Sequence, residues 1–338
     1  MIRIFLRHRI QKKKKFEQFL QHEKFLKNGN YKFNKIYSCL YLDNEENRSH
    51  LNNVIENDPR KRTNFKKKII KYLVYTGKIK INGSLSSKEF SGTLYFFSNN
   101  GNEEKVFDFE NKKVKLLYHD SSDYEFKIDS HDYFKKYFNV PSIEVKENEI
   151  IDERLIVFNN NLDDTKMLLT SSFNSYLEYF KRLDIKNLDY FNIGKELLSQ
   201  ELTSREKIFF KLIINFKAEI PQVRMHGDFR RHNILVEKET ANQYIIDWEF
   251  SKHYFFFYDL FHFIYHDTIN DESSELLSNY FSGKYDSYLF EIFSIFKIKF
   301  DVDQKRQYFY IFLFEHYMKK GKRDCMLLEK YEKLLQRY

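Results

Sequence analysis

The sequence predicts an α+β protein in which a small antiparallel β-sheet precedes a mostly helical region. From residue 91, short runs of β-branched and aromatic residues alternate with turn-forming residues, which is typical of antiparallel strands. Beyond residue 160, apolar residues recur at helical spacing over long stretches. The chain has 338 residues, 42% hydrophobic and 18% aromatic, so it can bury the cores of two compact units and is too apolar to be disordered.

The expected sheet begins as a meander of three strands, at residues 93–98, 105–109 and 114–118. Residues 99–102 read NNGN, which supplies a turn between the first two strands. A helix is expected over residues 122–138. It should end before Pro141, because a proline disfavours helical backbone at the residue that precedes it. Two shorter strands are expected to follow, at residues 142–145 and 150–157.

The apolar pattern after residue 160 predicts helices with one interruption. The helices are expected at residues 165–183, 193–216, 272–300 and 304–338. Between Pro221 and Trp248 the chain instead predicts a loop and two short strands joined by a hairpin, at residues 233–236 and 244–247.

Basic residues are concentrated near the N-terminus of a chain whose formal net charge is +8. Lys12–Lys15 form one run, and a second run lies between Arg60 and Lys71. We expect residues 1–90 to form a basic, partly helical N-terminal extension, with helices around 11–26 and 66–75, that could contact a membrane surface or an anionic glycan. Nucleic-acid binding is not favoured, because no helix-turn-helix, zinc finger or aromatic RNA-binding signature accompanies the charge.

The two cysteines, Cys39 and Cys325, lie far apart, so a disulfide framework is not expected. The most apolar stretch, residues 254–265, is shorter than the ~20 residues that span a bilayer. The N-terminus lacks the apolar core of a secretion signal. A soluble, cytoplasmic protein is therefore expected.

Five polar residues between residues 226 and 247 stand out among apolar neighbours: His226, Gly227, Asp228, Asn233 and Asp247. Asp228 and Asn233 bracket a short loop, and Asp247 ends the next expected strand. Carboxamide and carboxylate oxygens are hard ligands that suit Mg²⁺, while a separate carboxylate could accept a proton from a hydroxyl. The set predicts phosphoryl transfer from ATP, in which positioning and charge neutralisation supply most of the catalysis.

This constellation resembles the aminoglycoside phosphotransferase and choline kinase group of small-molecule kinases. Residues 226–233 read HGDFRRHN, residues 246–249 read IDWE, and residues 258–260 read YDL. The resemblance implies a two-lobed protein kinase-like fold, with a nucleotide-binding N-lobe at residues 91–157 and a helical C-lobe, carrying the catalytic loop and acceptor site, at 158–338. It also implies ATP and Mg²⁺ as cofactors and the hydroxyl of a small molecule as acceptor.

The resemblance implies a role for each residue of the motif. Asp228 would be the catalytic base, Asn233 and Asp247 would bind Mg²⁺, and His226 would brace the loop. Asp259 would hold the lobe together. Arg230, two residues past the base, is expected to neutralise charge on the γ-phosphate.

The family also places an ATP-binding lysine on the third strand, paired with a glutamate of the following helix. Lys115 and Glu125 fit these places best, with Lys105 and Lys127 as alternative lysines. No glycine-rich phosphate loop is found, although residues 98–102 could offer backbone N–H groups to phosphates. Residues 153–156 lie where the backbone would meet adenine.

The sequence does not identify the molecule that would accept the phosphate. Acidic residues in the helical region would suit a cationic acceptor such as an aminoglycoside, and aromatic residues would suit a quaternary ammonium group. These acidic residues are Asp267, Asp271, Glu272, Glu275 and Glu315. A sugar or glycan-precursor hydroxyl is the slightly favoured acceptor. The alternative functions are a pseudokinase that binds without turnover, and a basic membrane- or nucleic-acid-binding protein.

Overall fold

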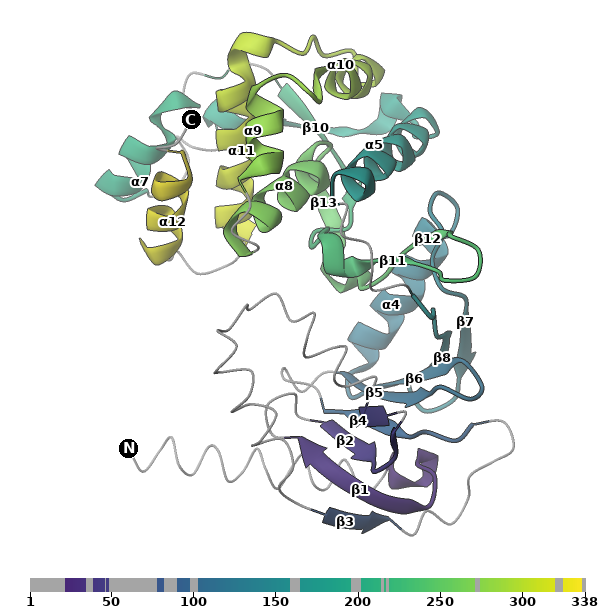
Figure 1. Cartoon of the computed structure of the whole chain (residues 1–338). Coiled ribbons are helices and arrows are strands. Elements are labelled where there is room, and N and C mark those ends of the chain that lie inside the picture. The colour runs from purple at the N-terminus through teal and green to yellow at the C-terminus, as the bar shows by residue number, and fades with distance from the viewer. Residues whose placement is uncertain are drawn as a thin grey trace. The chain divides into compact units, whose positions relative to one another are not determined.

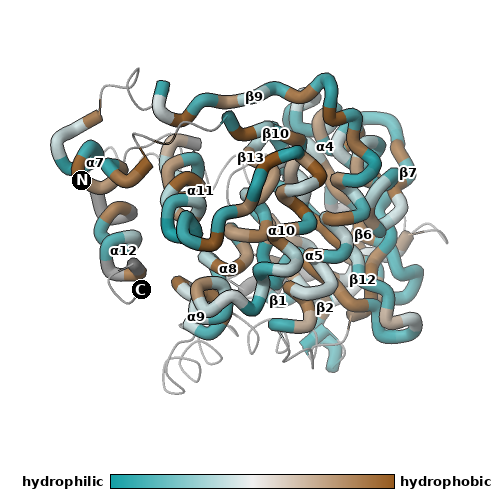
Figure 2. The backbone as a smooth tube through the Cα atoms, turned by 90° about the horizontal axis from the view of Figure 1, so that it is seen from above, coloured by the Kyte–Doolittle hydropathy of each residue, from teal (hydrophilic) through white to brown (hydrophobic). Residues whose placement is uncertain are grey.

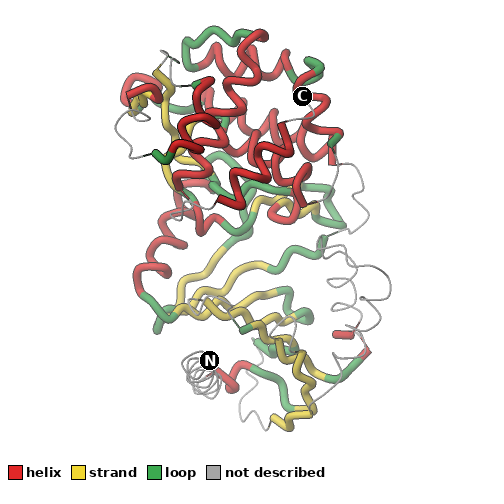
Figure 3. The backbone as a smooth tube through the Cα atoms, turned by 90° about the vertical axis from the view of Figure 1, so that its left-hand side faces the viewer, coloured by secondary structure: helices red, strands yellow, loops and turns green. Residues whose placement is uncertain are grey.

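The computed structural model describes residues 22–34, 39–45, 47–48, 78–81, 90–97, 103–158, 165–195, 202–213, 216, 219–270, 274–319 and 325–335. The described residues form two compact units. Unit 1 draws on Met1–Asp129, Asn139–Asn161 and Leu235–Tyr244. Unit 2 draws on Ser130–Phe138, Leu162–Ile234 and Ile245–Tyr338. Strands dominate unit 1 and helices dominate unit 2 (Figure 3), so the expected α+β division into a sheet part and a helical part is confirmed.

Unit 1 is built on an antiparallel sheet of eight described strands in the order β3-β1-β2-β4-β5-β6-β8-β7 (Figure 1). The strands are β1 (Gly29–Asn34), β2 (Cys39–Leu42), β3 (Lys78–Ile81), β4 (Leu94–Phe96), β5 (Glu103–Asp108), β6 (Lys113–Tyr118), β7 (Ile143–Lys146) and β8 (Ile150–Arg154). The five strands from β4 to β8 fall within or close to the ranges that the sequence predicts. Helix α4 (Ser121–Phe134) follows β6, four residues shorter at its end than expected.

The sheet begins earlier in the chain than the expected boundary at residue 91. Strand β1 pairs with both β2 and β3, and β2 pairs with β4. The buried side chains of Tyr31 and Leu40 share one apolar cluster with Tyr95 and Leu117. The described strands β1, β2 and β3 are therefore part of this sheet and not of a separate extension. The helices expected at 11–26 and 66–75, and the two basic runs, lie outside the described residues, apart from a short 3₁₀ turn at Glu23–Phe25.

The expected boundary at residue 158 also differs from the structure. The hairpin of β11 (Ile234–Val236) and β12 (Gln243–Ile245) lies mostly in unit 1 rather than in the helical unit. Ion pairs of Arg154 with Glu237 and of Lys112 with Glu239 (3.0 Å) attach it there. Conversely, Ser130–Phe138 belongs to unit 2, where Phe134 stacks on Trp248 with ring centroids 3.8 Å apart.

The two faces of the unit 1 sheet have different partners, because successive side chains of a strand point to opposite faces. We call the first the helix face: Tyr124 and Ile128 of α4 pack there against Val114, Leu116 and Tyr118 of β6. The second, the N-terminal face, carries the cluster of Leu26, Tyr31, Leu40, Phe90, Tyr95, Val106 and Leu117. Lys115 therefore points away from the face that α4 covers.

A buried carboxylate on the N-terminal face is surrounded by hydrogen-bond donors. Glu104 is only 2% exposed, and its Oε2 accepts a hydrogen bond from the hydroxyl of Tyr95. His22 Nδ1 lies 3.0 Å and His119 Nε2 3.7 Å from the same oxygen. Burial alone would raise the pKa of Glu104, but the hydrogen bonds of His119, His22 and Tyr95 lower it to about 2.

Replacing Glu104 with glutamine is expected to make the stability of unit 1 less sensitive to acid. The pKa of this carboxylate is lowered in the folded state, so its ionised form stabilises the fold at pH values above its ordinary pKa of 4.5. This contribution is about 3 kcal/mol, and it is lost as the pH falls through about 2. The difference in unfolding free energy between wild type and Glu104→Gln should be constant above about pH 5 and shrink below it. Denaturant unfolding at several pH values measures this, with the exposed Glu110→Gln as control. A difference that does not change with pH would contradict the prediction.

Unit 2 contains a helical layer and a small antiparallel sheet. The described helices are α5 (Thr165–Lys181), α7 (Ser204–Phe209), α8 (Tyr258–Asn270), α9 (Glu275–Phe281), α10 (Asp286–Ile295), α11 (Lys305–Lys319) and α12 (Cys325–Leu335). The sheet has the order β13-β10-β9, formed by β13 (Lys252–Phe255), β10 (Glu219–Met225) and β9 (Asp189–Asn192). Helix α8 contacts α5, α9 and α11, and many of the buried side chains are aromatic. Figure 2 shows polar and apolar residues interspersed along these helices.

Several helical predictions for unit 2 were too long. The expected helix at 193–216 corresponds, among the described residues, to the end of β9, α7 and a 3₁₀ turn at Phe210–Leu212. The expected helix at 272–300 is broken between α9 and α10, where Gly283 has a φ of +90°. The last expected helix is divided into α11 and α12. Strands β9, β10 and β13 were not predicted; in β10, Pro221 indicated a turn.

Within the described part of the chain, no helix is both long enough and apolar enough to cross a membrane. Cys39 is a free, buried thiol.

Candidate active site

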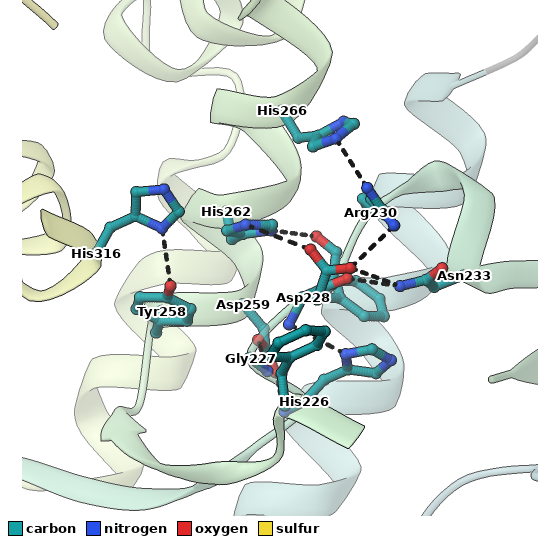
Figure 4. Close-up of polar contacts among 12 residues, drawn as sticks. His226, Gly227, Asp228, Arg230, Asn233, Tyr258, Asp259, His262, His266 and His316 are labelled. Carbon is teal, nitrogen blue, oxygen red and sulfur yellow. Dashed lines mark hydrogen bonds and ion pairs between the residues drawn. The ribbon is translucent and has the colours of Figure 1, made fainter. Parts of the chain in front are cut away.

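The polar motif lies in unit 2, on the loop that leaves the end of β10 (Figure 4). His226, Gly227 and Asp228 follow β10, and a 3₁₀ turn at Arg231–Asn233 leads into β11. The φ of Gly227 is +82°, and a Cβ atom there would lie 2.3 Å from Phe250 O. A glycine is therefore required at the point where the chain turns toward Asp228.

The buried carboxylate of Asp259, on α8, holds the start of this loop. Its Oδ2 accepts hydrogen bonds from the backbone N–H of His226 and from the hydroxyl of Tyr176, both at 2.6 Å. Its Oδ1 accepts a bond from the backbone N–H of Gly227 at 2.9 Å. Burial raises the pKa of Asp259 to about 6, against the lowering effect of these three hydrogen bonds. Asp259 thus connects α5, α8 and the loop, as a structural role requires.

His226 links the loop to the segment that carries Asp247. Its Nδ1 accepts a hydrogen bond from the backbone N–H of Asp228 at 3.2 Å, so its Nε2 carries the proton and donates to Ile246 O at 2.7 Å. Burial lowers the pKa of His226, which keeps the ring neutral in this tautomer. The ring is fully buried and does not reach solvent. These bonds join the loop to the backbone of Ile246, and a bracing role for His226 stays a prediction.

The carboxylate of Asp228 is partly exposed and has three polar neighbours (Figure 4). Arg230 Nη2 lies 3.1 Å from Oδ2, and Asn233 Nδ2 donates to the same oxygen at 3.3 Å. His262 Nε2 lies 3.9 Å from Oδ1. Main-chain bonds fix the position of Asp228, while its side chain remains 22% exposed and able to meet a second molecule.

Asn233 and Asp247 offer oxygen donors from adjacent segments. Ile246 N donates to Asn233 O at 3.0 Å, so the residue before Asp247 is bonded directly to the Asn233 backbone. The described hydrogen bonds of the Asn233 carboxamide use Nδ2, toward the backbone O (2.8 Å) and Oδ2 of Asp228. The carboxamide oxygen Oδ1 is therefore turned away from Asp228. Asp247 has left-handed backbone, with φ 61° and ψ 55°.

The oxygen donors of Asn233 and Asp247 fit Mg²⁺ if phosphate and water supply the remaining ligands. Among the described residues, no three His, Cys, Asp or Glu side chains are grouped closely enough to hold a metal ion by themselves. An ion held by Asn233 and Asp247 would take its other ligands from phosphate oxygens and water, which is common for Mg²⁺.

The structure does not bring the expected lysine and glutamate of unit 1 together. Lys115 Nζ pairs with Asp152 of β8, not with Glu125, which lies exposed on α4. Of the alternative lysines, Lys127 pairs with Glu153 (2.6 Å) and Lys105 pairs with Glu103 (3.0 Å). The pairing of Lys115 with Glu125 was wrong because Lys115 and α4 lie on opposite faces of the sheet. The predicted phosphate loop, residues 98–102, lies outside the described residues.

Several acidic residues were expected to bind the acceptor molecule. Those that the structure describes are hydrogen-bonded, ion-paired or buried. Glu315 is 4% exposed and accepts hydrogen bonds from the backbone N–H of Phe255 at 3.1 and 3.2 Å. Glu275 pairs with Lys166, and Asp267 is buried. Asp271 and Glu272 lie outside the described residues.

Two histidines near Asp228 were not singled out from the sequence. His262 Nδ1 donates to Phe229 O at 2.9 Å, which orients Nε2 toward Asp228. Arg230 Nη1 lies 3.4 Å from His266 Nε2, one helical turn farther along α8. His262 and His266 lie three and seven residues after Asp259. This spacing was the available signal, because residues three, four and seven apart share one face of a helix.

The comparisons with known proteins agree with this geometry. Residues 177–289, which include the whole motif, match the model of the phosphotransferase enzyme family. No curated protein is significantly similar in sequence to this chain.

Solved structures with a similar arrangement include kinases of several small molecules. Aminoglycoside phosphotransferase APH(4)-Ia is 10% identical, with a TM-score of 0.46 over 71% of this chain and 92% of that chain. Macrolide 2'-phosphotransferase MphH from Brachybacterium faecium is also 10% identical, with a TM-score of 0.42 over 69% and 88% of the two chains. Choline kinase LicA from Streptococcus pneumoniae is 9% identical, with a TM-score of 0.37 over 71% and 90%.

Residues 177–289 are thus similar to the phosphotransferase enzyme family, and the geometry of the motif agrees with that similarity. The resemblance to the aminoglycoside phosphotransferase and choline kinase group is thereby confirmed, and it is carried by residues 177–289.

Proposed function

We propose that this protein transfers the γ-phosphate of ATP to a hydroxyl group of a small molecule, with Mg²⁺ as cofactor. The observation that carries the proposal is the partly exposed carboxylate of Asp228, fixed by main-chain bonds beside Asn233 and the cation of Arg230. A base, oxygen ligands and a cation in one place are the components of phosphoryl transfer.

In the proposed reaction, Asp228 orients the acceptor hydroxyl and takes its proton as the oxygen attacks the γ-phosphorus. The new O–P bond forms while the bond to the leaving ADP oxygen breaks. Arg230 would turn from Asp228 Oδ2 toward the transferred phosphate, whose charge it neutralises. Asn233 and Asp247 would hold the Mg²⁺, which neutralises phosphate charge when bound.

The surroundings of Asp228 favour an uncharged or anionic acceptor over a polycationic one. Arg230 and the imidazole of His266 lie beside the base. The acidic residue Glu315, by contrast, is committed to the backbone of Phe255. A sugar-like hydroxyl is therefore the favoured acceptor, because a polyamine would meet the cation of Arg230.

Thermal unfolding with and without Mg²⁺–ATP tests this proposal. Ligand at 100 times its Kd should stabilise the wild type by about 2.7 kcal/mol. The gain should require Mg²⁺ and be lost in Asp247→Ala, which lacks a metal ligand. Asp189→Ala, which removes an exposed carboxylate of the same unit, serves as the control and should respond like the wild type. Equal stabilisation of Asp247→Ala would contradict the proposed metal site.

A pseudokinase would also be stabilised by Mg²⁺–ATP but would transfer no phosphate to any acceptor. Contact of the basic runs with a membrane or an anionic glycan stays a prediction, since these runs lie outside the described residues. A cytoplasmic location also stays a prediction.

A further inference from the structure

One histidine of α8, His262, is buried beside the carboxylate of Asp228 (Figure 4). Its Nε2 lies 3.9 Å from Asp228 Oδ1, and its side chain is only 4% exposed. The other carboxylate oxygen, Oδ2, has Arg230 Nη2 at 3.1 Å and Asn233 Nδ2 at 3.3 Å. Oδ1 is therefore the oxygen of Asp228 that is left for an acceptor hydroxyl, and His262 lies beside that oxygen.

A backbone carbonyl fixes the ring of His262 and decides which nitrogen carries its proton. Nδ1 lies 2.9 Å from Phe229 O, and a carbonyl oxygen can only accept a hydrogen bond, so Nδ1 must donate it. Phe229 is fully buried, and its ring packs edge-on against that of Tyr176 with centroids 5.3 Å apart, which holds this carbonyl in place. A neutral His262 therefore presents the lone pair of Nε2 to Asp228.

The distance of 3.9 Å between Nε2 and Oδ1 is what we expect for two acceptors that face each other. It is longer than a hydrogen bond, because neither a neutral Nε2 nor an ionised carboxylate has a proton to donate. Once Asp228 takes a proton, its carboxyl group becomes a donor, and a shift of about 1 Å brings the two atoms to hydrogen-bond distance. Contacts of catalytic groups are often long without substrate and shorten in the complex.

Among the described contacts, Asp228 supplies the negative charge that faces the ring of His262. Tyr258 and Tyr265, also on α8, have their ring centroids 5.8 and 6.3 Å from that of His262. Burial raises the pKa of both tyrosines, which keeps them uncharged.

Two further imidazoles lie near His262, and each contacts a different group. His316 of α11 has its ring centroid 5.3 Å away, and its Nδ1 lies 2.9 Å from the hydroxyl of Tyr258. His266 of α8 has its centroid 6.0 Å away, and its Nε2 lies 3.4 Å from Nη1 of Arg230, the cation of this site. Of the three histidines, His262 is therefore the one whose ring nitrogen is directed at the base.

We infer that His262 takes the proton of the acceptor hydroxyl from Asp228 in the proposed transfer reaction. The O–H bond of the acceptor breaks as its oxygen forms the bond to the γ-phosphorus, and the proton goes to Asp228 Oδ1. The Oδ1–H bond then breaks and the lone pair of Nε2 takes the proton, which leaves a carboxylate and an imidazolium. Imidazole is a stronger base than a carboxylate, so the proton is held more firmly on His262.

The proton leaves by the same route after the product has gone, through Asp228 to water, because the side chain of Asp228 is 22% exposed and that of His262 is not. His262 thus acts through the base and does not touch the substrate. This inference rests on the proposed function and adds a positioning residue to it.

The pH dependence of Mg²⁺–ATP hydrolysis by the full chain, with water as the acceptor, tests this role. His262 must be neutral to take the proton, so the wild-type rate should fall as the pH drops through the pKa of His262. His262→Asn keeps an amide donor for Phe229 O but lacks the basic nitrogen. At about pH 8 its rate should be about 10–100-fold lower. Its acidic fall should move lower by about one pH unit or more, because carboxylic acids titrate below imidazole.

His316→Asn is the matched control, since it replaces a buried imidazole of the same cluster that does not face Asp228. The pH of its acidic fall should equal that of the wild type. An acidic fall that does not move in His262→Asn, or that moves equally in both variants, would overturn the inference.

Nitrogen NMR of histidine-labelled wild type tests the same pair of residues without turnover and without a substitution of His262. At about pH 8, His262 should be neutral with its proton on Nδ1. It should titrate at a lower pH in Asp228→Asn, because that variant lacks the facing negative charge. A proton on Nε2 instead, or an unchanged titration in Asp228→Asn, would contradict the inference. A wild type that neither binds nor hydrolyses Mg²⁺–ATP would refute the proposed function, whatever the titration shows.

Discussion

Asp228→Asn is expected to lower kcat by about 10²–10⁴-fold, the usual contribution of a general base, while the affinity for Mg²⁺–ATP changes little. Asparagine has nearly the shape of aspartate but cannot take the proton of the acceptor hydroxyl. The backbone contacts of Asp228 with His226 Nδ1 and Asn233 Nδ2 do not involve the replaced oxygen, so the loop should keep its conformation. Initial rates over a range of acceptor concentrations, together with a direct Kd for Mg²⁺–ATP, measure the two effects separately.

The matched control for this experiment is Asp247→Asn. It changes a proposed metal ligand instead of the base and should therefore weaken Mg²⁺-dependent nucleotide binding. Equal loss of nucleotide binding in both variants would contradict the separate roles of Asp228 and Asp247. A kcat of Asp228→Asn close to that of the wild type would refute Asp228 as the base.

Asp259→Ala is expected to lower the free energy of unfolding of unit 2 by about 3 kcal/mol or more. The substitution leaves two backbone N–H groups, of His226 and Gly227, and the hydroxyl of Tyr176 without their buried acceptor. Each unsatisfied buried donor costs about 1–3 kcal/mol. Denaturant unfolding measures the change, and activity should fall with it because the same bonds hold the loop that carries Asp228.

Tyr176→Phe provides the matched comparison, since it removes one of the three donors and leaves Asp259 in place. Its effect should be about 1 kcal/mol, the net value of one hydrogen bond. If Asp259→Ala proves no more destabilising than Tyr176→Phe, the carboxylate does not hold the loop in the way described.

The residues of the proposed catalytic motif could be placed together from the sequence because they lie close together in the chain. Asp228 and Asn233 lie five residues apart on one loop, and Asp247 lies at the end of the next short strand. Apolar runs bracket each of them, so the hairpin that brings them together is encoded within a short stretch. The α+β class was predictable for the same reason, since strand and helix periodicities are short-range patterns.

The strands β1, β2, β3 and β10 were missed because long-range partners form them. Strand β1 pairs with β3 across the undescribed segment before Lys78. Both strands alternate polar and apolar residues, as in KIKI of β3, but so short a pattern does not identify the partner strand. Strand β10 contains Pro221, which locally favours a turn, yet the strand lies between β9 and β13 with most of its side chains buried. Burial between two neighbours outweighed the local preference.

The sequence by itself determined the α+β class and the motif loop, and it led to the roles proposed for Asp228, Asn233 and Asp247. Only the tertiary structure decided which lysine faces α4. Alternation along β6 puts Lys115 and Leu116 on opposite faces but does not say which face the helix covers. The packing of Tyr124 and Ile128 on one face, and of Phe25 and Phe90 on the other, makes that choice. These contacts join segments far apart in the chain, and the lower free energy of the buried arrangement selects one face.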